Sequence, residues 1–393
     1  MGDAHDATGA AAGANAAVSV ADFEWLAAER LEAGVHGYFA GGAGDEVTLR
    51  ENVAAYQRRR LRPRVAVDVS QVTTDVEPLG ARTAGTSVAG GAAAGRPGAS
   101  PAVSPILVAP VAFQRLVDPE GEIGMAAAAA EQGSIMCLST LATTRPSRLA
   151  EAVPEGRRWF QLYCFRDLAV TRALLDEAVA AGFEAVVVTV DAPRAGRRER
   201  DLRTGFEIPP DLGVPSLESA FAAAGGLSIQ EVFAQVDPSL DWDDLAELCD
   251  TCELPVLIKG VLRGDDAARA AQCGAAGVIV SNHGGRQLDR VPASLDVLAE
   301  ARQAVGPELP LLVDGGIRRG TDVAIALALG ANAVLVGRPV LWGLAAHGRA
   351  GAARVLQLLR EEFELSLALL GCRSPADLEP AHVADPAQAY IRA

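Results

Sequence analysis

Eight short apolar runs recur between residues 106 and 338, and their spacing indicates the fold. Several are rich in Val and Ile, and most end in Gly, Pro or a polar residue. Short runs that are apolar at nearly every position are typical of strands buried on both faces of a parallel sheet. The runs cover residues 106–113, 135–139, 159–164, 185–191, 255–260, 277–283, 310–315 and 333–338.

Segments with helical spacing lie between these runs, most clearly at 120–132, 169–181, 265–273 and 320–329. Eight strands that alternate with helices predict an α/β protein whose parallel sheet closes into a (β/α)8 TIM barrel. An open doubly wound sheet is the alternative. It is disfavoured because no Gly-x-Gly-x-x-Gly opens the first strand–helix unit, and "GGAGDEV" near residue 41 precedes the first strand and lacks the third glycine.

The remaining segments predict additions to one barrel domain spanning 20–393, after a disordered tail at 1–19. Residues 20–65 are expected to form a helical cap that begins with "ADFEWLAAERL". Residues 84–103 are rich in Gly, Ala, Pro and Ser, which is typical of a flexible insertion without a core of its own. Residues 200–240 look irregular and are expected to form a lid-like loop after the fourth strand.

Composition excludes some classes of partner. The net charge of −15 argues against binding to nucleic acid or to an anionic membrane surface. No apolar run approaches the roughly 18 residues of a transmembrane helix. The first residues lack the basic start and apolar centre of a secretory signal, so we expect a cytoplasmic protein.

Six cysteines in a chain of this length do not predict a disulfide framework. Cys249 and Cys252 form a Cys-x-x-Cys, but no second pair and no nearby histidine completes a metal site. Adjacent acidic residues suggest that this pair lies at the exposed end of a helix. No metal site is predicted.

Polar and charged residues follow the apolar runs, and in a barrel the carboxyl ends of the strands face the active site. Any one of them has an ordinary structural explanation: His283 as a satisfied turn residue, Lys259 extended outward, "RAGRRERDLR" as a solvated loop, Tyr38 as a core aromatic. Their joint occurrence at one mouth predicts an active site. The residues that end runs three to eight are Gln161, Tyr163, Asp191, Lys259, Ser281, His283, Asp314, Gly337 and Arg338.

Five motifs occur in order: "FQLY", "TVDAPRAGRRERDLR", "SNHGGRQLD", "DGGIRRGTDV" and "ALGANAVLVGRP". With them the chain resembles the FMN-dependent 2-hydroxy-acid oxidase and dehydrogenase family, which includes glycolate oxidase, lactate oxidase and mandelate-oxidising enzymes. The resemblance covers about 20–385 apart from 84–103. It implies FMN as cofactor and oxidation of an (S)-2-hydroxy acid to a 2-oxo acid.

The resemblance also implies catalytic roles. His283 would be the active-site base, and Asp191 would hold its imidazole and stabilise its charged form. Arg198 and Arg286 would bind the substrate carboxylate, which suits the two-pronged geometry of guanidinium.

Two tyrosines and two departures from the family complete the predicted substrate pocket. Tyr38 would donate to the carboxylate, and Tyr163 would lie near the substrate hydroxyl. Leu141 stands where glycolate-type oxidases carry Trp, and Phe165 where several relatives carry Tyr. Both changes predict a more apolar pocket, and Leu141 a roomier one, for lactate or a longer aliphatic or aryl acid.

For the flavin, the resemblance places Lys259 at the pyrimidine end of the ring, where its charge stabilises the reduced form. The loops after strands seven and eight would hold the phosphate. The further FMN contacts that it implies are Pro110, Val111, Ala112, Ser139, Gln161, Tyr163, Thr189, Ser281, Asp314, Gly315, Gly316, Ile317, Arg318, Gly337 and Arg338.

The sequence leaves the electron acceptor open. The chain has no room for a haem domain and no membrane-docking segment, which favours direct oxidation by O2 with release of hydrogen peroxide. A dehydrogenase that uses another acceptor is the alternative. A flavin-barrel isomerase would not need the paired Arg198 and Arg286, and a non-catalytic flavin-binding protein would not need the full polar set. The family also implies a homotetramer.

Overall fold

Eight parallel strands form a closed barrel, which confirms the predicted fold. The computed structural model describes residues 13–79, 103–209, 212–218 and 229–385. Each strand pairs with the next along the chain, and the last pairs with the first. The strands are β2 (Ile106–Val108), β3 (Ile135–Leu138), β4 (Arg157–Leu162), β5 (Val186–Thr189), β6 (Val256–Val261), β7 (Gly277–Val280), β8 (Leu311–Asp314) and β9 (Ala333–Val336).

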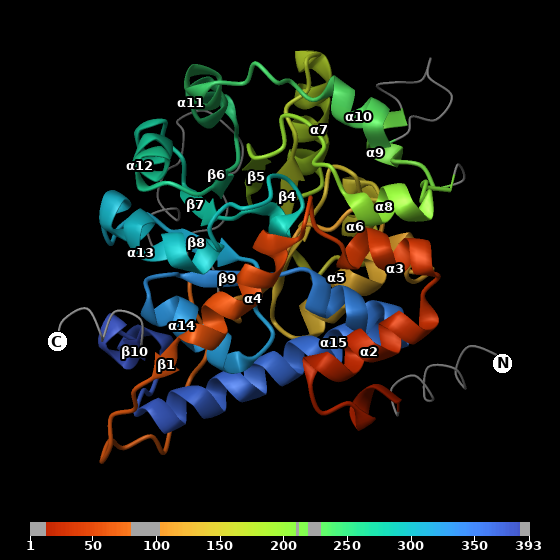
Figure 1. The fold of residues 1–393 in the computed structure, drawn as a ribbon. Coiled ribbons are helices and arrows are strands. Elements are labelled where there is room, and N and C mark those ends of the chain that lie inside the picture. Colours follow the sequence, from red (N-terminus) through yellow and green to blue (C-terminus); the bar gives the residue numbers. More distant parts are fainter. Residues whose placement is uncertain (1–12, 80–102, 210–211, 219–228, 386–393) are drawn as a thin grey trace.

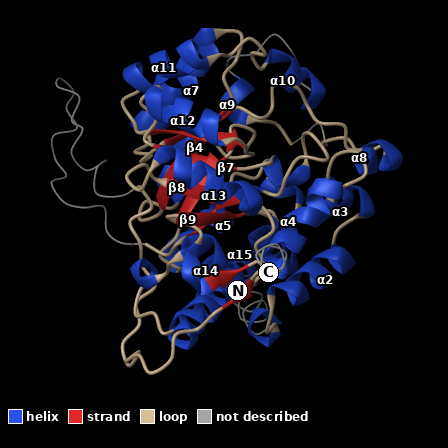
Figure 2. Cartoon of the chain, turned by 60° about the vertical axis from the view of Figure 1, so that its left-hand side comes forward, coloured by secondary structure: helices blue, strands red, loops and turns tan. Residues whose placement is uncertain are grey.

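Helices surround the barrel, as Figures 1 and 2 show. The long helix α15 (Arg338–Leu370) is interrupted at His347 and Gly348 and packs against α2, α5 and α14. The helices that follow strands are α5 (Gly121–Glu131), α6 (Pro146–Ala152), α7 (Leu168–Ala180), α11 (Trp242–Thr251), α12 (Gly264–Gln272), α13 (Ser294–Val305) and α14 (Gly320–Ala328).

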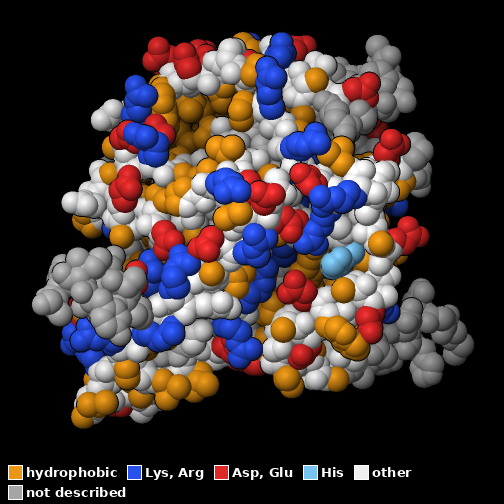
Figure 3. Space-filling model, in the orientation of Figure 1, with side chains coloured by type: hydrophobic (Ala, Val, Ile, Leu, Met, Phe, Trp, Pro, Cys, Tyr) orange, Lys and Arg blue, Asp and Glu red, His pale blue; other side chains and the backbone are white. Residues whose placement is uncertain are grey.

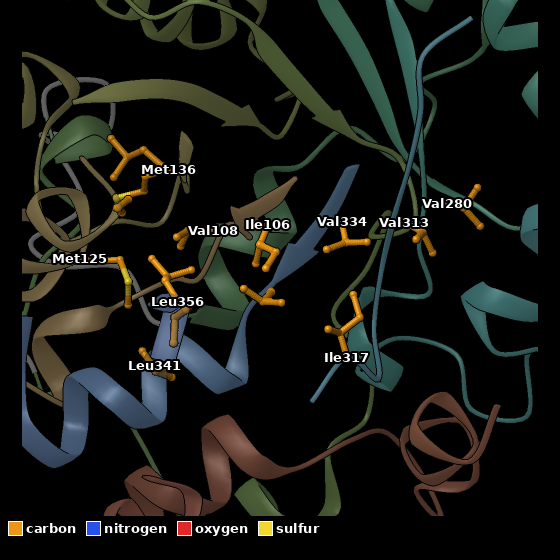
Figure 4. Close-up of a cluster of buried hydrophobic side chains, with 14 of the residues drawn as sticks. Ile106, Val108, Met125, Met136, Val280, Val313, Ile317, Val334, Leu341 and Leu356 are labelled. Atoms are coloured by element: carbon orange, nitrogen blue, oxygen red, sulfur yellow. The ribbon is translucent and has the colours of Figure 1, made fainter. Parts of the chain in front are cut away.

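The strands are apolar along most of their length because each is buried on both sides. Alternate residues belong to two separate clusters. One set, such as Ile106, Val108 and Val334, packs outward against the helices, and Figure 4 shows it beside Met125 and Leu341. The other set fills the interior of the barrel, and its members are Leu107, Ile135, Cys137, Trp159, Ala185, Val187, Leu257, Ile279, Leu312, Ala333 and Leu335.

The predicted N-terminal cap is present as α2 (Val20–Arg30), α3 (Ala33–Ala40) and α4 (Val47–Arg58). A short antiparallel pair, β1 (Arg60–Leu61) with β10 (Val383–Ala384), joins the segment after the cap to the C-terminal part of the chain. Of the tail predicted at 1–19, residues 13–19 are described: Ala14 and Ala17 are buried, whereas Val18 is 75% exposed. The insertion at 84–103 lies outside the described residues except for Val103, whose backbone pairs with Val76.

The segment at 200–240 contains more regular structure than its sequence indicates. Its described parts include α8 (Glu199–Thr204), α9 (Pro215–Glu218) and α10 (Ile229–Gln235). Helix α8 packs against α3: Phe206 lies 5.2 Å from the Tyr38 ring, and Arg200 forms a 2.7 Å ion pair with Glu46. The lid-like segment is therefore joined to the cap.

Two further expectations concern cysteines and membranes. Cys249 and Cys252 lie at the end of α11 as predicted, but both are half-buried rather than exposed. Within the described ranges, no three His, Cys, Asp or Glu side chains are grouped so as to hold a metal ion. No helix among these residues is long and apolar enough to cross a membrane.

Candidate active site

The polar residues at the barrel mouth continue the alternation of the strands. Leu257 faces the interior of the barrel, so Lys259, two residues later, faces the same way at the carboxyl end. The same step of two leads from Trp159 to Gln161 and from Leu312 to Asp314. In the other five strands, a step of two from the last interior residue gives Ala109, Ser139, Thr189, Ser281 and Gly337.

These residues surround one cavity at the mouth, with about 1180 Å³ of empty space including its opening. This exceeds the ~300–1,000 Å³ usual for small-molecule sites, in part because it includes the open mouth, and it suits a cofactor together with a substrate. Of the predicted site residues, Asp191 and Ser281 do not line it. The others that line it are Tyr38, Pro110, Val111, Ala112, Ser139, Leu141, Gln161, Tyr163, Thr189, Arg198, Lys259, His283, Arg286, Asp314, Gly315, Gly316, Ile317, Arg318, Gly337 and Arg338.

His283 lies in the cavity wall with Asp191 directly behind it. The His283 Nδ1 is 2.8 Å from Asp191 Oδ1, and their side chains are 22% and 12% exposed. Burial acts to raise the pKa of Asp191, but the His283 ring and Lys259 outweigh it and hold that pKa below its usual value. Gly260 makes room for the carboxylate: its φ is +109°, and a Cβ there would lie 2.7 Å from the Asp191 side chain.

The backbone at His283 is in an unusual conformation. His283, Gly284 and Gly285 have φ values of +57°, +62° and +75°. For a residue with a Cβ, this left-handed region costs roughly 1–2 kcal/mol, so the surrounding structure has to hold it in place. The two glycines after the histidine allow the turn that aims its ring into the cavity.

Two arginines contact one tyrosine. The guanidinium carbons of Arg198 and Arg286 lie 5.2 and 5.0 Å from the centre of the Tyr38 ring. Arg286 also donates to the backbone carbonyls of Tyr38 and Gly41, and Arg198 forms a 3.1 Å ion pair with Asp201. Burial, together with the charge of Arg198, lowers the pKa of Arg286 to about 10, so Arg286 remains charged at neutral pH.

Lys259 is the buried cation of the site. Its Nζ donates to Ser281 Oγ at 2.8 Å and lies 3.1 Å from Asp314 Oδ2. Burial acts to lower the pKa of Lys259, but the carboxylates of Asp314 and Asp191 outweigh it and raise that pKa. The ammonium is therefore charged at neutral pH, and it lines the cavity.

Unused polar atoms fit a flavin. Among the described residues, no hydrogen-bond partner is present for three buried atoms of the cavity-lining side chains: Gln161 Nε2, Thr189 Oγ1 and Asp314 Oδ1. Buried polar atoms normally have partners. The alternating carbonyl and N–H groups of an isoalloxazine ring, and the hydroxyls of a ribityl chain, are of the right type to satisfy them.

The loops after β8 and β9 fit a phosphate. Gly315 and Gly316 have φ values of +91° and +89°, and Gly337 is the N-cap of α15, so backbone N–H groups and a helix N-terminus meet here. A Cβ at Gly316 would lie 2.0 Å from the Asn52 carbonyl oxygen, so only glycine fits there. The Arg318 side chain adds a cation to this end of the cavity.

Three residues considered in the sequence have contacts that the sequence did not indicate. The Arg338 guanidinium donates to the carbonyls of Phe39, Gly41 and Gly284, so it joins the cap to the His283 turn rather than pointing freely at a phosphate. Ser281 is fully buried behind Lys259. Phe165 is also fully buried and does not line the cavity, so the expectation that it makes the pocket more apolar is wrong.

Sequence reasoning missed several lining residues. Gln287 belongs to the quoted motif "SNHGGRQLD" and could have been included with Arg286. Phe233 lies on α10, and no local pattern connects that helix to the barrel mouth. The lining residues that were missed or not assigned are Phe39, Ala195, Phe233, Gly284, Gln287, Leu335, Val336, Pro339 and Leu341.

A closed parallel barrel with a phosphate cradle, a buried lysine and a carboxylate-held histidine defines a flavin-dependent barrel oxidoreductase. Comparison with known proteins agrees. The model of the FMN-dependent dehydrogenase family matches residues 27–97 and 98–385, and the chain belongs to this family. Its cofactor is FMN.

Individual relatives resemble the chain over nearly its whole length. It is 45% identical to the L-lactate oxidase of a Nostoc species, over 92% of this chain and 96% of the relative. It is 43% identical to the glycolate oxidase of Spinacia oleracea, over 93% and 95%. Among solved structures, a soluble mutant of the (S)-mandelate dehydrogenase from Pseudomonas putida has a TM-score of 0.83 at 35% identity, over 94% and 99%. A mandelate oxidase with (S)-2-phenylpropionate has a TM-score of 0.81 at 38% identity, over 94% and 98%.

Proposed function

We propose that this chain oxidises an (S)-2-hydroxy acid to the 2-oxo acid and that O2 is reduced to hydrogen peroxide. The observation that carries the proposal is the His283–Asp191 pair beside two arginines in one cavity. A base held by a carboxylate suits proton removal, and guanidinium groups suit a carboxylate substrate. The names of the relatives, L-lactate oxidase and glycolate oxidase, support the same substrate class.

In the proposed reaction Arg198 and Arg286 bind the carboxylate, and the Tyr38 hydroxyl donates to it. Because Nδ1 of His283 is engaged by Asp191, Nε2 is the atom that accepts the substrate proton. Asp191 stabilises the imidazolium that results. The Tyr163 hydroxyl lies on the substrate-hydroxyl side.

Bound FMN supplies the acceptor for the two electrons of the alcohol carbon. Lys259 would lie against the pyrimidine end of its ring, and Gln161 and Thr189 would satisfy their unused atoms on it. Gly315 and Gly316 would receive the phosphate. Over a full cycle the acid loses two electrons and two protons, and O2 gains both, which gives one 2-oxo acid and one hydrogen peroxide.

The substrate is proposed to be larger than glycolate. Leu141 lines the cavity and is 4% exposed, and Ala195 and Phe233 add further apolar surface. Such a wall favours the side chain of lactate, a longer aliphatic acid or an aryl acid over hydrogen.

Anaerobic mixing of the FMN-loaded protein with glycolate, L-lactate, (S)-2-hydroxyoctanoate and (S)-mandelate tests the proposal through flavin absorbance. Loss of the oxidised spectrum with one of the larger acids, reversed by air with one equivalent of peroxide, is the expected result. Reduction that air does not reverse would identify a dehydrogenase, the activity named for the Pseudomonas putida structure. No reduction by any of the four acids would refute the assigned chemistry. The His283→Ala variant should retain the flavin spectrum and lose turnover.

The homotetramer implied by the resemblance is also part of this proposal. Light scattering should give about four times the chain mass of 40.6 kDa. A mass equal to that of one chain would contradict it.

A further inference from the structure

We propose that Asn52, on the cap helix α4, is a positioning residue that fixes the backbone turn carrying His283. The inference rests on the proposed function, in which His283 is the base. Asn52 does not line the cavity, so its effect on the reaction would pass through the residues that it holds.

Asn52 and Asn282 form a reciprocal amide pair. Asn52 Nδ2 donates to Asn282 Oδ1 at 2.9 Å, and Asn282 Nδ2 donates to Asn52 Oδ1 at 2.7 Å. The residues are 2% and 3% exposed, and 230 positions separate them in the chain. The pair therefore joins the N-terminal cap to the loop after β7 in a site without competing water.

The Asn282 side chain spans the turn that follows it. Its Oδ1 also accepts from the Gly285 N–H at 3.1 Å, and its Nδ2 also donates to the Pro292 carbonyl at 3.1 Å. The turn between Asn282 and Gly285 contains His283 at φ +57°, a conformation that persists only where neighbouring groups enforce it. Asn52 helps to hold His283 in this conformation because it fixes the orientation of the Asn282 amide.

Asn52 also contacts the proposed phosphate loop. A Cβ built at Gly315 would lie 3.2 Å from Asn52 Nδ2, and one at Gly316 would lie 2.0 Å from the Asn52 carbonyl oxygen. One cap residue thus touches both the loop that carries the base and the loop proposed for the phosphate. The cap sets the position of the base relative to the cofactor end of the cavity.

The test compares Asn52→Leu with a matched control on the same helix. Leucine has nearly the shape of asparagine but makes neither hydrogen bond. The control is Thr48→Val, because Thr48 is fully buried and its hydroxyl exchanges two 3.1 Å hydrogen bonds with the Val291 backbone, further along the same loop. Both variants remove two hydrogen bonds between the cap and this loop, but only the first touches the His283 turn.

Flavin reduction is measured by stopped flow with FMN-loaded protein and saturating L-lactate, or with whichever of the four acids reduces the wild type fastest. The rate in Asn52→Leu should be about 100-fold lower than in the wild type. The concentration of acid that gives half the maximal rate should change less than threefold. Thr48→Val should reduce its flavin within threefold of the wild type. A reduction rate for Asn52→Leu within threefold of the control would overturn the proposal.

Hydrogen exchange of the FMN-loaded protein without substrate gives a second readout. Asn52→Leu should speed exchange of the amides at 283–286 at least tenfold, and Thr48→Val should leave them unchanged. Equal exchange in both variants would overturn the proposal. If no acid reduces the wild type, the proposed function fails, and exchange alone decides this inference. If Asn52→Leu does not fold, Asn52→Asp, which keeps the acceptor for Asn282 and loses the donor, should show an intermediate loss in both measurements.

Discussion

Replacing Asp191 with Asn is the most direct test of how the base is held. The substitution keeps the size of the side chain and removes the charge that lies 2.8 Å from His283 Nδ1. The imidazole would then gain its proton without an anion behind it. We expect binding of FMN and of the acid to change little and proton removal to become slow.

The size of the effect follows from the geometry. A hydrogen bond to a charged group contributes about 1.5–3 kcal/mol, and two unit charges 4 Å apart at an effective dielectric constant of 20 attract by about 4 kcal/mol. The two estimates describe one contact and are not added, so we expect Asp191→Asn to raise the activation free energy of flavin reduction by about 3–4 kcal/mol. At 1.36 kcal/mol per tenfold, flavin reduction should slow by about 150- to 900-fold.

The ionisation of Asp191 determines the pH range in which its charge acts on the reaction. Because the pKa of Asp191 lies below its ordinary value of 3.8, the carboxylate is ionised throughout the neutral range. Its contribution is present above pH 3.8 and is lost only as the pH falls through the lowered pKa. The rates of the wild type and of Asp191→Asn can therefore be compared between about pH 6 and 9 without titration of this carboxylate.

Anaerobic stopped-flow reduction at saturating acid measures this rate directly. Asp296→Asn serves as the control, because it makes the same charge change in a surface ion-pair group with Arg58 and Arg59. The control should stay within twofold of the wild type. An Asp191→Asn enzyme with full FMN content and a rate within fivefold of the wild type would refute the role given to this carboxylate.

Three further predictions concern other parts of the site. Lys259→Met leaves Asp314 buried without its cation, so the free energy of unfolding should fall by about 3–5 kcal/mol and the Tm of the FMN-free protein by about 5 °C. Adding Asp314→Asn should recover at least half of the lost Tm in calorimetry. No recovery would show that the pair is not coupled. Leu141→Trp should narrow the cavity, so kcat/KM for (S)-2-hydroxyoctanoate should fall at least tenfold relative to glycolate (about 1–3 kcal/mol), whereas an unchanged ratio would place the substrate elsewhere. Basic side chains gather near the middle of the face in Figure 3 in spite of the net charge of −15, and exposed Arg194 and Arg197 lie on the segment after β5. Arg194→Gln with Arg197→Gln should lower kcat/KM several-fold at low salt through weaker steering of an anionic substrate, with a difference that disappears near 0.5 M NaCl; a loss that salt does not remove would contradict steering.

The barrel and most of its mouth could be predicted because both follow from local patterns. Strands buried on both faces read as continuous apolar runs, and the first polar residues after them lie at the carboxyl ends. A step of two from interior residues such as Leu257 and Leu312 then gives Lys259 and Asp314. Local order along each strand is sufficient for this part of the site.

Other features depend on contacts between distant segments, which no local pattern encodes. Arg338 ends the eighth run beside a glycine-rich motif, yet its guanidinium donates hydrogen bonds to backbone carbonyls of the cap. Phe165 lies two residues after Tyr163, so alternation alone would place both side chains on the same side. Instead Phe165 is fully buried, and its backbone pairs with the distant Val236. Phe233 reaches the cavity only because α10 folds back over the mouth, and Asn52 carries no signal apart from its distant partner, Asn282.

The guanidinium of Arg338 has a consequence for biosynthesis. Its bond to the Phe39 carbonyl spans 299 residues and its bond to Gly41 spans 297, among the longest separations of any contact at the site. During synthesis the cap is therefore made long before Arg338, the residue that is hydrogen-bonded to it. The entropic cost of closing so large a loop is overcome only when the eighth strand is in place. The cavity at the barrel mouth is therefore among the last parts of the molecule to be completed.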